Sequence, residues 1–178
     1  MTKTKIREQI REKRLALTPA YIREKSLRMT EDIIRSDAYR NSRILYIYFP
    51  VNNEIDTNYL IAHALKEEKT VAVPVCISSD DMVFERIDKS RTFHDNRYRI
   101  MEPSYDPSLV IDGEGLMIVP MVAYKEKHRV GYGRHFYNNY LHGRNYVHTI
   151  AVGYDFQEIK EGFDVTDQDV PMSEIRCY

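Results

Sequence analysis

The sequence predicts a single α/β domain spanning residues 1–178, in which helices cover both faces of a mostly parallel central sheet. Two observations support this fold class. Short apolar runs rich in β-branched and aromatic residues alternate with amphipathic helical segments along the chain. The length of 178 residues and a composition of 43% hydrophobic and 30% charged residues suit one ordinary globular domain. No repeat, low-complexity tract or linker divides the chain.

The first two helices are predicted from residue spacing and from a cap. Apolar residues recur at spacings of four and seven along residues 3–17, and basic residues form a second stripe beside them. Thr18-Pro19 has the form of an N-cap followed by proline at the first helical position. We therefore expect a second helix from this pair to about Ser36 or Tyr39.

Four apolar runs of strand length follow, together with two helical segments. The predicted strands are residues 44–49, 71–73, 116–119 and 147–152, with weaker candidates at 82–87 and 97–100. Helices are predicted from Asp56-Thr57 through Leu65 and over residues 136–141. The alternation of the two kinds of element is typical of a parallel sheet with helical crossovers.

Prolines mark where the predicted strands end. Pro50, Pro74 and Pro120 follow the first three strands. Parallel strands end at one edge of a sheet, and open α/β sheets bind their ligands at that edge. We therefore expect the segments after these prolines to carry the chemistry.

The balance of charge excludes a broad basic surface. The chain has 26 Lys+Arg against 27 Asp+Glu, a formal net charge of -1, so we expect no nucleic-acid or membrane partner. Charge is nevertheless segregated locally. Residues 3–14 hold six basic and two acidic side chains, residues 124–145 five and one, and residues 155–174 one and seven. Such segregation suits a small phosphorylated ligand.

The chain contains no predicted membrane span or secretory signal. No apolar run approaches the roughly 20 residues of a spanning helix, and charged residues occur throughout Met1 to Arg14. The two cysteines, Cys76 and Cys177, form no CxxC pair and are interpreted as incidental thiols. A cytoplasmic location is therefore expected.

The most informative local motif is Gly131-Tyr132-Gly133, which follows the third predicted strand and precedes a predicted helix. Glycine lets backbone N–H groups approach a phosphate closely, and Arg129 and Arg134 on either side supply positive charge. As a bare pattern GxG fits an ordinary turn better, and only its place after a buried strand between two arginines makes a phosphate loop an equally good interpretation. A dinucleotide oxidoreductase is disfavoured, because the full GxGxxG motif is absent and the pattern lies late in the chain.

Five segments of the chain carry a resemblance to a known family. The run VPMVAYKEKHRVGYGRHFYNNYL (119–141) is similar to the pattern VPGLAFDxxGxRLGYGGGYYDRFL. Four other segments match in the same order, namely KTKIREQIREKRLALT (3–18), YFPVNNEIDT (48–57), Glu102-Pro103 and TDQDVPMSEI (166–175). Together they resemble the 5-formyltetrahydrofolate cyclo-ligases, also called methenyltetrahydrofolate synthetases. The resemblance spans nearly the whole chain and implies a layered α/β/α, Rossmann-like fold of the cyclo-ligase type.

The resemblance implies an ATP- and magnesium-dependent ligase that converts 5-formyltetrahydrofolate to 5,10-methenyltetrahydrofolate. In such an enzyme ATP phosphorylates the formyl oxygen, N10 of the folate attacks the activated carbon, and phosphate departs. This chemistry needs charge neutralisation and positioning more than a protein nucleophile. The implied partner is a small molecule, a reduced folate, and we expect a monomer or a weak homodimer.

The resemblance also implies site residues by position. Those implied to bind the nucleotide are Lys3, Arg7, Arg129, Gly131, Gly133, Arg134, His135, Phe136 and Tyr137, with Arg129, Arg134 and Tyr137 in catalytic roles. Those implied to contact the folate are Phe49, Glu54, Tyr132 and Phe136, and those implied to hold Mg²⁺ are Asn138 and Asp169. From the residues alone, Lys3 and Arg7 fit a solvated basic face better than a nucleotide site. Glu54 fits a loop carboxylate near a helix start, where the helix dipole favours negative charge.

The catalytic loop departs from the family pattern. His135 replaces a glycine, and Asn138 replaces the aspartate that binds magnesium, so one negative charge is missing. Asn139 replaces an arginine directed at phosphate, and Lys125 and Ser173 replace acids.

These departures leave three interpretations open. The first is a working cyclo-ligase in which Arg134 substitutes for the charge lost at Asn139. The second is a paralogue that binds folate or nucleotide but turns over slowly or not at all. The third is an enzyme of the same fold that acts on another substrate and gives His135 a new role, although a lone histidine is more often a structural hydrogen-bonding group.

Overall fold

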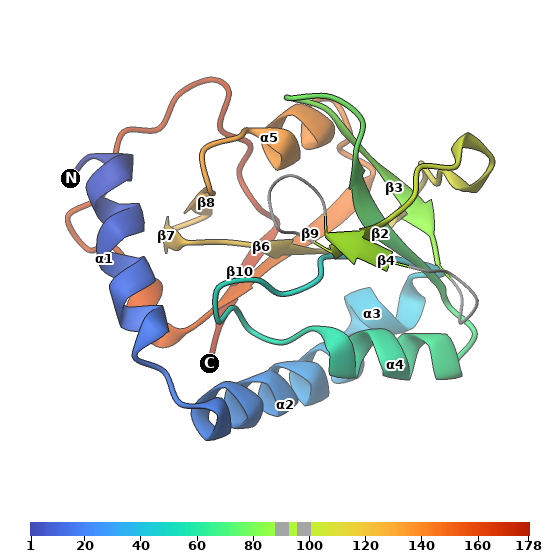
Figure 1. Cartoon of the computed structure of the whole chain (residues 1–178), viewed down its shortest axis with the longest axis horizontal. Helices are drawn as coiled ribbons and strands as arrows, with labels where there is room; N and C mark the ends of the chain where they lie inside the picture. The colour runs from blue at the N-terminus through green and yellow to red at the C-terminus, as the bar shows by residue number, and fades with distance from the viewer. Residues whose placement is uncertain (88–92, 96–100) are drawn as a thin grey trace.

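The protein is described here by a computed structural model, which covers residues 1–87, 93–95 and 101–178 (Figure 1). Its helices are α1 (Lys3–Leu15), α2 (Pro19–Arg35), α3 (Asp37–Asn41), α4 (Asn58–Lys66) and α5 (Phe136–Leu141). Its strands are β1 (Ile44–Ile47), β2 (Thr70–Cys76), β3 (Met82–Arg86), β4 (Phe93–Asp95), β5 (Met101–Pro103), β6 (Gly115–Pro120), β7 (Ala123–Lys125), β8 (His128–Val130), β9 (Val147–Gly153) and β10 (Glu174–Cys177). The α/β class predicted from the sequence is confirmed.

A six-stranded sheet in the order β10-β9-β6-β1-β2-β3 forms the centre of the molecule. The pairs β10–β9, β9–β6, β6–β1 and β1–β2 are parallel, and only β3 runs antiparallel, against β2. The sheet is therefore mostly parallel, as predicted. The carboxyl ends of β1, β6 and β9 lie at one edge, and the small antiparallel pair β7–β8 follows β6 at that edge.

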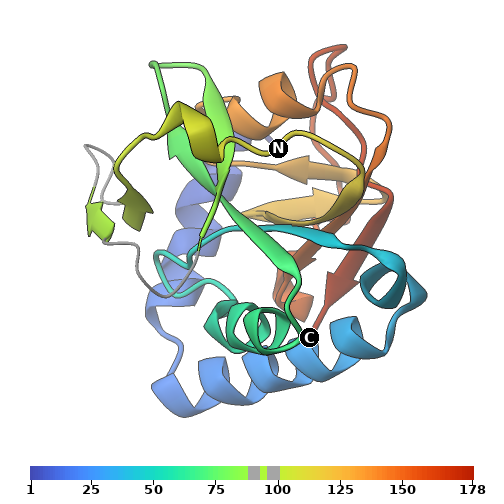
Figure 2. The same ribbon diagram turned by 90° about the vertical axis from the view of Figure 1, so that its right-hand side faces the viewer.

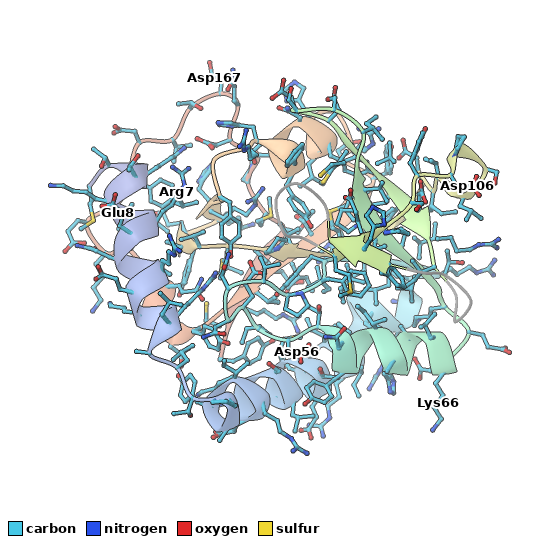
Figure 3. The ribbon with its side chains drawn as sticks, viewed as in Figure 1. Arg7, Glu8, Asp56, Lys66, Asp106 and Asp167 are labelled. Atoms are coloured by element: carbon cyan, nitrogen blue, oxygen red, sulfur yellow. The ribbon has the colours of Figure 1, made fainter. Side chains whose placement is uncertain are left out.

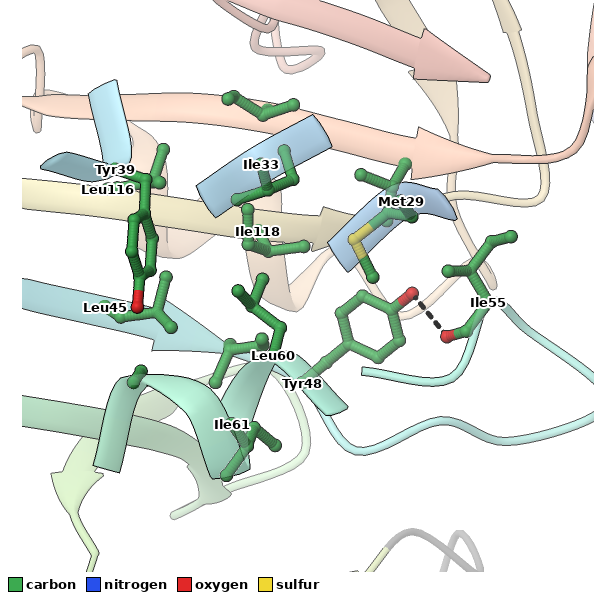
Figure 4. Close-up of a cluster of buried hydrophobic side chains, with 14 of the residues drawn as sticks. Met29, Ile33, Tyr39, Leu45, Tyr48, Ile55, Leu60, Ile61, Leu116 and Ile118 are labelled. Carbon is green, nitrogen blue, oxygen red and sulfur yellow. Dashed lines mark hydrogen bonds between the residues drawn. The ribbon is translucent and has the colours of Figure 1, made fainter. Parts of the chain in front are cut away.

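Helices cover both faces of the sheet. Buried side chains of α2, α3 and α4 pack on one face, where Tyr48 donates a hydrogen bond of 3.1 Å to the carbonyl of Ile55 (Figure 4). Buried residues of α5 pack on the other face with those of β3. The two perpendicular views show α2 and α4 together on one side of the sheet and α5 on the opposite side (Figures 1 and 2).

Helix α1 lies apart from these layers, beside the β7–β8 pair (Figure 1). Its apolar stripe, Ile6 and Ile10, packs on Val122, Ala123 and Val130 in a separate small core. The packing brings the basic stripe of α1 to the carboxyl edge of the sheet. Within the described residues no helix combines the length and apolar character needed to cross a membrane.

The predicted helix boundaries hold with one difference. Thr18 caps α2 by accepting the N–H of Tyr21 at 3.2 Å, as its sequence pattern predicts. The second helix was expected to run to residue 36 or 39, but it ends at Arg35. Ser36 has extended backbone angles, and its hydroxyl caps a new short helix by accepting the N–H of Tyr39 at 3.2 Å. The hydroxyl of a serine competes with the helical ladder, and here it divides one predicted helix into two.

The expectation that each proline marks the end of a strand was wrong for Pro74. Pro50 lies outside a strand and Pro120 is the last residue of β6, but Pro74 lies within β2. The pairing of β2 with β1 ends at Ala72. Pro74 has no backbone N–H, but it lies beyond this pairing, so no hydrogen bond between the two strands is lost. Pro74 is tolerated because this part of β2 has no partner on the β1 side, and not because the strand ends there.

Several elements were not predicted. The short pairs β4–β5 and β7–β8 carry no strong apolar pattern, and β10 is half-buried throughout. The weak candidate at 82–87 is β3, whereas the candidate at 97–100 lies outside the described residues. Cys76 and Cys177 are not joined in a disulfide in the described structure, and both are partly buried.

Gly115 begins β6 where its backbone comes very close to β1. A Cβ at this position would lie 2.7 Å from the carbonyl oxygen of Ile44 and 3.1 Å from the ring of Tyr46. We expect Gly115→Ala to lower the free energy of unfolding by about 1–3 kcal/mol, because backbone of the central strand must move to admit the methyl group. Denaturant unfolding measures this.

The matched control is Gly113→Ala, whose new Cβ would lie 3.6 Å from the Ile44 side chain, an ordinary contact. It is expected to stay within about 0.5 kcal/mol of the parent protein. Equal stability of the two variants would contradict the close approach of β6 and β1.

Candidate active site

A cavity of about 290 Å³ opens at the carboxyl edge of the sheet. Its walls come from α1, the loop after β1, the ends of β2 and β6, and the segment from β8 into α5. All of the residues that the resemblance implied as site residues line it, namely Lys3, Arg7, Phe49, Glu54, Arg129, Gly131, Tyr132, Gly133, Arg134, His135, Phe136, Tyr137, Asn138 and Asp169. The structure therefore gathers them at one place.

One end of the cavity is cationic. Arg129, on β8, is only 9% exposed, and it has no ion-pair partner among the described residues. Its guanidinium donates one bond of 3.3 Å to Asn138 Oδ1, lies 5.3 Å from the centre of the Tyr137 ring, and leaves Nε without a partner. Burial lowers the pKa of Arg129 to about 10. A buried cation of this kind offers strong binding to an anion that enters the cavity.

Helix α1 adds two more cations to this end. Arg7 points from α1 toward the cavity and donates from Nε to the carbonyl of Gly131 at 2.8 Å (Figure 3). Burial lowers the pKa of Arg7. Lys3 forms an ion pair of 2.7 Å with Asp169. These contacts reject the alternative in which Lys3 and Arg7 are only a solvated face.

The two glycines of the motif make this close packing possible. A Cβ on Gly131 would lie 2.6 Å from Nη1 of Arg129. Gly133 has φ +95°, and a Cβ there would lie 3.4 Å from the Arg7 guanidinium. His135 takes the left-handed conformation, with φ 59°, at the position where the family pattern has glycine. The loop thus keeps a glycine-type backbone despite the substitution.

The two residues implied to hold magnesium lie in contact. Asn138 Nδ2 donates to Asp169 Oδ1 at 3.2 Å, and Lys3 donates to Asp169 Oδ2. Burial raises the pKa of Asp169, but hydrogen bonds from Lys3 and Thr166 outweigh it and leave the pKa lowered. No group of three or more His, Cys, Asp or Glu suited to a metal occurs in the described part of the chain. Asn138 turns its amide nitrogen to Asp169 and its oxygen to Arg129, so the Asp169 carboxylate is the oxygen ligand at hand for a hard cation, and Asn138 Oδ1 would join it only after the amide turns over.

The other end of the cavity is largely apolar. Phe49, Tyr48 and Met82 line it, and Phe49 packs edge-on against Phe93 with ring centres 5.2 Å apart. Glu54 lies among them, 4% exposed. Burial raises the pKa of Glu54. Arg14 and the Tyr132 hydroxyl act in the opposite direction, but the pKa stays above its ordinary value.

The residue Tyr137 offers an unused hydroxyl. It is buried beside Arg129 and has no hydrogen-bond partner in the described part of the chain. Burial raises its pKa far above the ordinary value, so the hydroxyl keeps its proton and is a hydrogen-bond donor. A ligand oxygen in the cavity is the partner that such a group lacks.

Asn139 does not line the cavity. Its amide donates to the carbonyl of Asp80, at the tip of the β2–β3 hairpin, at 3.0 Å. The family pattern has an arginine directed at phosphate at this position. In this chain Asn139 instead fastens α5 to the β2–β3 hairpin. Arg134 does line the cavity, and it is exposed.

Sequence reasoning missed part of the site. Glu102, in the Glu-Pro pair, is 7% exposed, lines the cavity and accepts the N–H of Cys76 at 3.0 Å. Arg14 is 3% exposed and contacts Glu54 and Tyr132. The only sequence signal for Arg14 was its place in the basic stripe of α1.

Comparison with known proteins supports the resemblance. A model of the 5-formyltetrahydrofolate cyclo-ligase family matches residues 1–177. The chain belongs to this family. Among curated members, the 5-formyltetrahydrofolate cyclo-ligase of Escherichia coli is 27% identical over 169 residues, 92% of this chain and 93% of that protein. The probable cyclo-ligase of Schizosaccharomyces pombe is 37% identical over 102 residues, so the matched part spans only 50% of that protein and 54% of this chain.

Solved structures of the family show the same fold. The 5,10-methenyltetrahydrofolate synthetase of Aquifex aeolicus has a TM-score of 0.79 at 23% identity and covers 98% of this chain, with 89% of its own chain matched. The synthetase of Mycoplasma pneumoniae has a TM-score of 0.74 at 20% identity, with 98% of each chain covered. At these identities the comparison establishes the architecture of a cyclo-ligase fold.

The ion pair between Lys3 and Asp169 fastens the start of α1 to the segment before β10. We expect Asp169→Asn to lower the free energy of unfolding at neutral pH by about 1–2 kcal/mol, because a charge-assisted bond in a half-buried setting is lost. Thermal and denaturant unfolding of the ligand-free protein measure the change.

Asp167→Asn is the matched control, because Asp167 is an exposed neighbour that points away from the cavity (Figure 3). Its unfolding is expected to match that of the parent protein within about 0.5 kcal/mol. A destabilisation as large as that of Asp169→Asn would show that charge in this segment matters in general and that the ion pair does not.

Proposed function

We propose that the protein converts 5-formyltetrahydrofolate to 5,10-methenyltetrahydrofolate, with ATP cleaved to ADP and phosphate. The observation that carries the proposal is the polarity of the cavity. One end holds a buried arginine without an ion-pair partner among the described residues, and the other is largely apolar with the buried carboxylates Glu54 and Glu102 in the lining. A phosphate chain fits the first end, and a reduced pterin fits the second.

The residues at the cationic end suit phosphoryl transfer. Arg129, Arg7 and Lys3 supply positive charge for the phosphates, and the glycine backbone of the loop leaves room for them. The Tyr137 hydroxyl is a donor for the phosphate or the formyl oxygen. No protein nucleophile is needed, because N10 of the folate attacks the activated formyl carbon and the oxygen departs with phosphate.

The residues at the apolar end suit the folate. Phe49, Tyr132 and Phe136 give aromatic surface, and Glu54 supplies an acceptor for the N–H groups of the pterin. Apolar walls exclude water from the activated carbon, which protects it from hydrolysis before ring closure.

Magnesium is proposed to accompany the nucleotide. Asp169 and Asn138 are the residues that would hold it, and when bound the ion neutralises phosphate charge. Because position 138 carries an amide, the protein contributes one negative charge, and the ion depends more on the phosphates than a site with two carboxylates would.

The remaining features of the proposal concern partners and location. The proposed ligands are small molecules, so neither nucleic acid nor a membrane surface is required, in agreement with a net charge of -1. We further propose a cytoplasmic enzyme that works as a monomer or weak homodimer, since the cavity is built from one chain.

The proposal is tested by following the methenyl product by its absorbance, with ATP, magnesium and 5-formyltetrahydrofolate present. Turnover is expected in the parent protein. Arg129→Met is expected to lower kcat/KM by about 100-fold or more, because the transferred phosphoryl group loses its buried cation.

Lys127→Met is the matched control, because this exposed residue lies in the same hairpin. It is expected to keep the activity of the parent protein. Detectable folate or nucleotide binding by calorimetry without any product would reject the ligase and support the paralogue that only binds.

The substitution at position 138 gives a second prediction. Asn138→Asp is expected to tighten binding of the magnesium–ADP complex by about tenfold, equivalent to ~1.4 kcal/mol of added attraction. With magnesium removed by a chelator, the same variant is expected to bind ADP more weakly, since the new carboxylate repels phosphate. Isothermal calorimetry in both conditions measures the two effects, and the same sign in both would contradict this account of Asn138.

A further inference from the structure

A buried charged network lies behind the folate end of the cavity. Arg14, in the last turn of α1, is 3% exposed, and Glu54 is 4% exposed. Arg14 Nη1 lies 3.8 Å from Glu54 Oε1. The Tyr132 hydroxyl bridges them, since it accepts from Arg14 Nη1 at 2.6 Å and donates to Glu54 Oε1 at 2.6 Å. Arg14 itself is not among the residues that line the cavity, so it acts through the other two.

The loop that carries Glu54 is also fastened to Arg14. The Asn53 side-chain amide donates to the Arg14 carbonyl at 2.9 Å. The second oxygen of Glu54 accepts the N–H of Val51 at 2.9 Å. Asn52 and Asn53 both have left-handed backbone angles, φ 50° and 55°, which turn the chain so that this bond closes. The carboxylate therefore has one orientation.

This arrangement is a poor way to gain stability. A buried ion pair contributes little net stability, because desolvation of both charges offsets their attraction. Within residues 1–87, 93–95 and 101–178, Arg14 Nε also has no hydrogen-bond partner, although Nη2 donates to the carbonyl of Met121. The cost of an unsatisfied buried donor favours a role in the site over a role in stability.

We propose that Arg14 is a positioning residue that holds Glu54 as an anion and, through the Tyr132 hydroxyl, fixes the carboxylate and the glycine loop relative to each other. The role of this anion in binding the folate rests on the proposed function; the coupling between Arg14 and Glu54 does not. Tyr132 lies between Gly131, whose carbonyl binds Arg7, and Gly133. The folate end and the nucleotide end of the cavity therefore share one residue.

The electrostatic surroundings of Glu54 give Arg14 a distinct effect. The ionisable groups that face it are Arg14 from α1, Tyr48 from the end of β1, Tyr132 and Tyr137 from the loop and α5, and Tyr154 from beyond β9. Arg14 is the cation of this set. Burial raises the pKa of Glu54 and Arg14 opposes that rise, so removal of the guanidinium must raise the pKa further.

The first test measures the ionisation of Glu54 directly in the ligand-free protein. Carbon NMR of carboxyl-labelled glutamate follows the titration, and loss of one signal in Glu54→Gln assigns it. In Arg14→Met the signal is expected to titrate about one pH unit higher or more than in the parent protein. Arg11→Met, at an exposed position on the same helix, is expected to leave it unchanged.

The second test measures the consequence for the substrate. Arg14→Met is expected to raise the KM for 5-formyltetrahydrofolate about tenfold at neutral pH. The reason is that Glu54 no longer offers the pterin a charged acceptor. The KM for ATP and kcat are expected to change less than about threefold. In the Glu54→Gln background, Arg14→Met should add almost nothing, since the residue acts through that carboxylate.

Arg14→Lys covers the outcome in which the methionine variant fails to fold. It keeps the charge and is expected to keep Glu54 titrating near its parent pH, while Tyr132→Phe raises that pH because the bridging bond is lost. A Glu54 signal that titrates identically in Arg14→Met and the parent protein would overturn the proposal. If the parent protein lacks turnover, the proposed function fails, and the NMR titration still decides whether Arg14 controls Glu54.

Discussion

Burial of positive charge without a carboxylate partner is the constraint on which this site depends. Arg129 is taken out of water on β8, and among the described residues its guanidinium contacts an amide oxygen and an aromatic ring but no carboxylate. Desolvation of such a cation costs several kcal/mol, and an anion in the cavity offsets that cost. The neighbouring cations Lys3 and Arg7 are held by a carboxylate and by a backbone carbonyl, so their positions are fixed before a ligand arrives. This preorganisation is what the phosphate binding that we propose requires.

The fold brings these groups together from distant parts of the sequence. Parallel pairing of β1, β6 and β9 places their carboxyl ends at one edge, and the β7–β8 pair with its glycine loop follows β6 there. Helix α1 packs on this pair through Ile6 and Ile10, which turns its basic stripe inward. A core of modest size thus aligns two segments that are more than a hundred residues apart.

The departures from the family pattern have different weights in the structure. His135 takes a left-handed conformation, which glycine adopts readily, so this position is one where a glycine would also fit. Asn139 lies outside the cavity and binds the β2–β3 hairpin. Asn138 is the departure with a chemical consequence, because it touches both Arg129 and Asp169 and supplies no negative charge. The change of charge at this residue, more than the shape of the loop, separates this chain from the family pattern.

The sequence by itself determined the α/β class, the capped start of α2, the apolar strands and, through matched motifs, many of the residues that line the cavity, though not Glu102. These features are local, because periodicity, caps and motifs are written in neighbouring residues. Tertiary structure alone decided that Pro74 stays within β2, that β10 pairs with β9, and that Arg14 is buried against Glu54. Whether a strand edge is open, or a charge is buried, depends on partners far along the chain, and no local pattern encodes them.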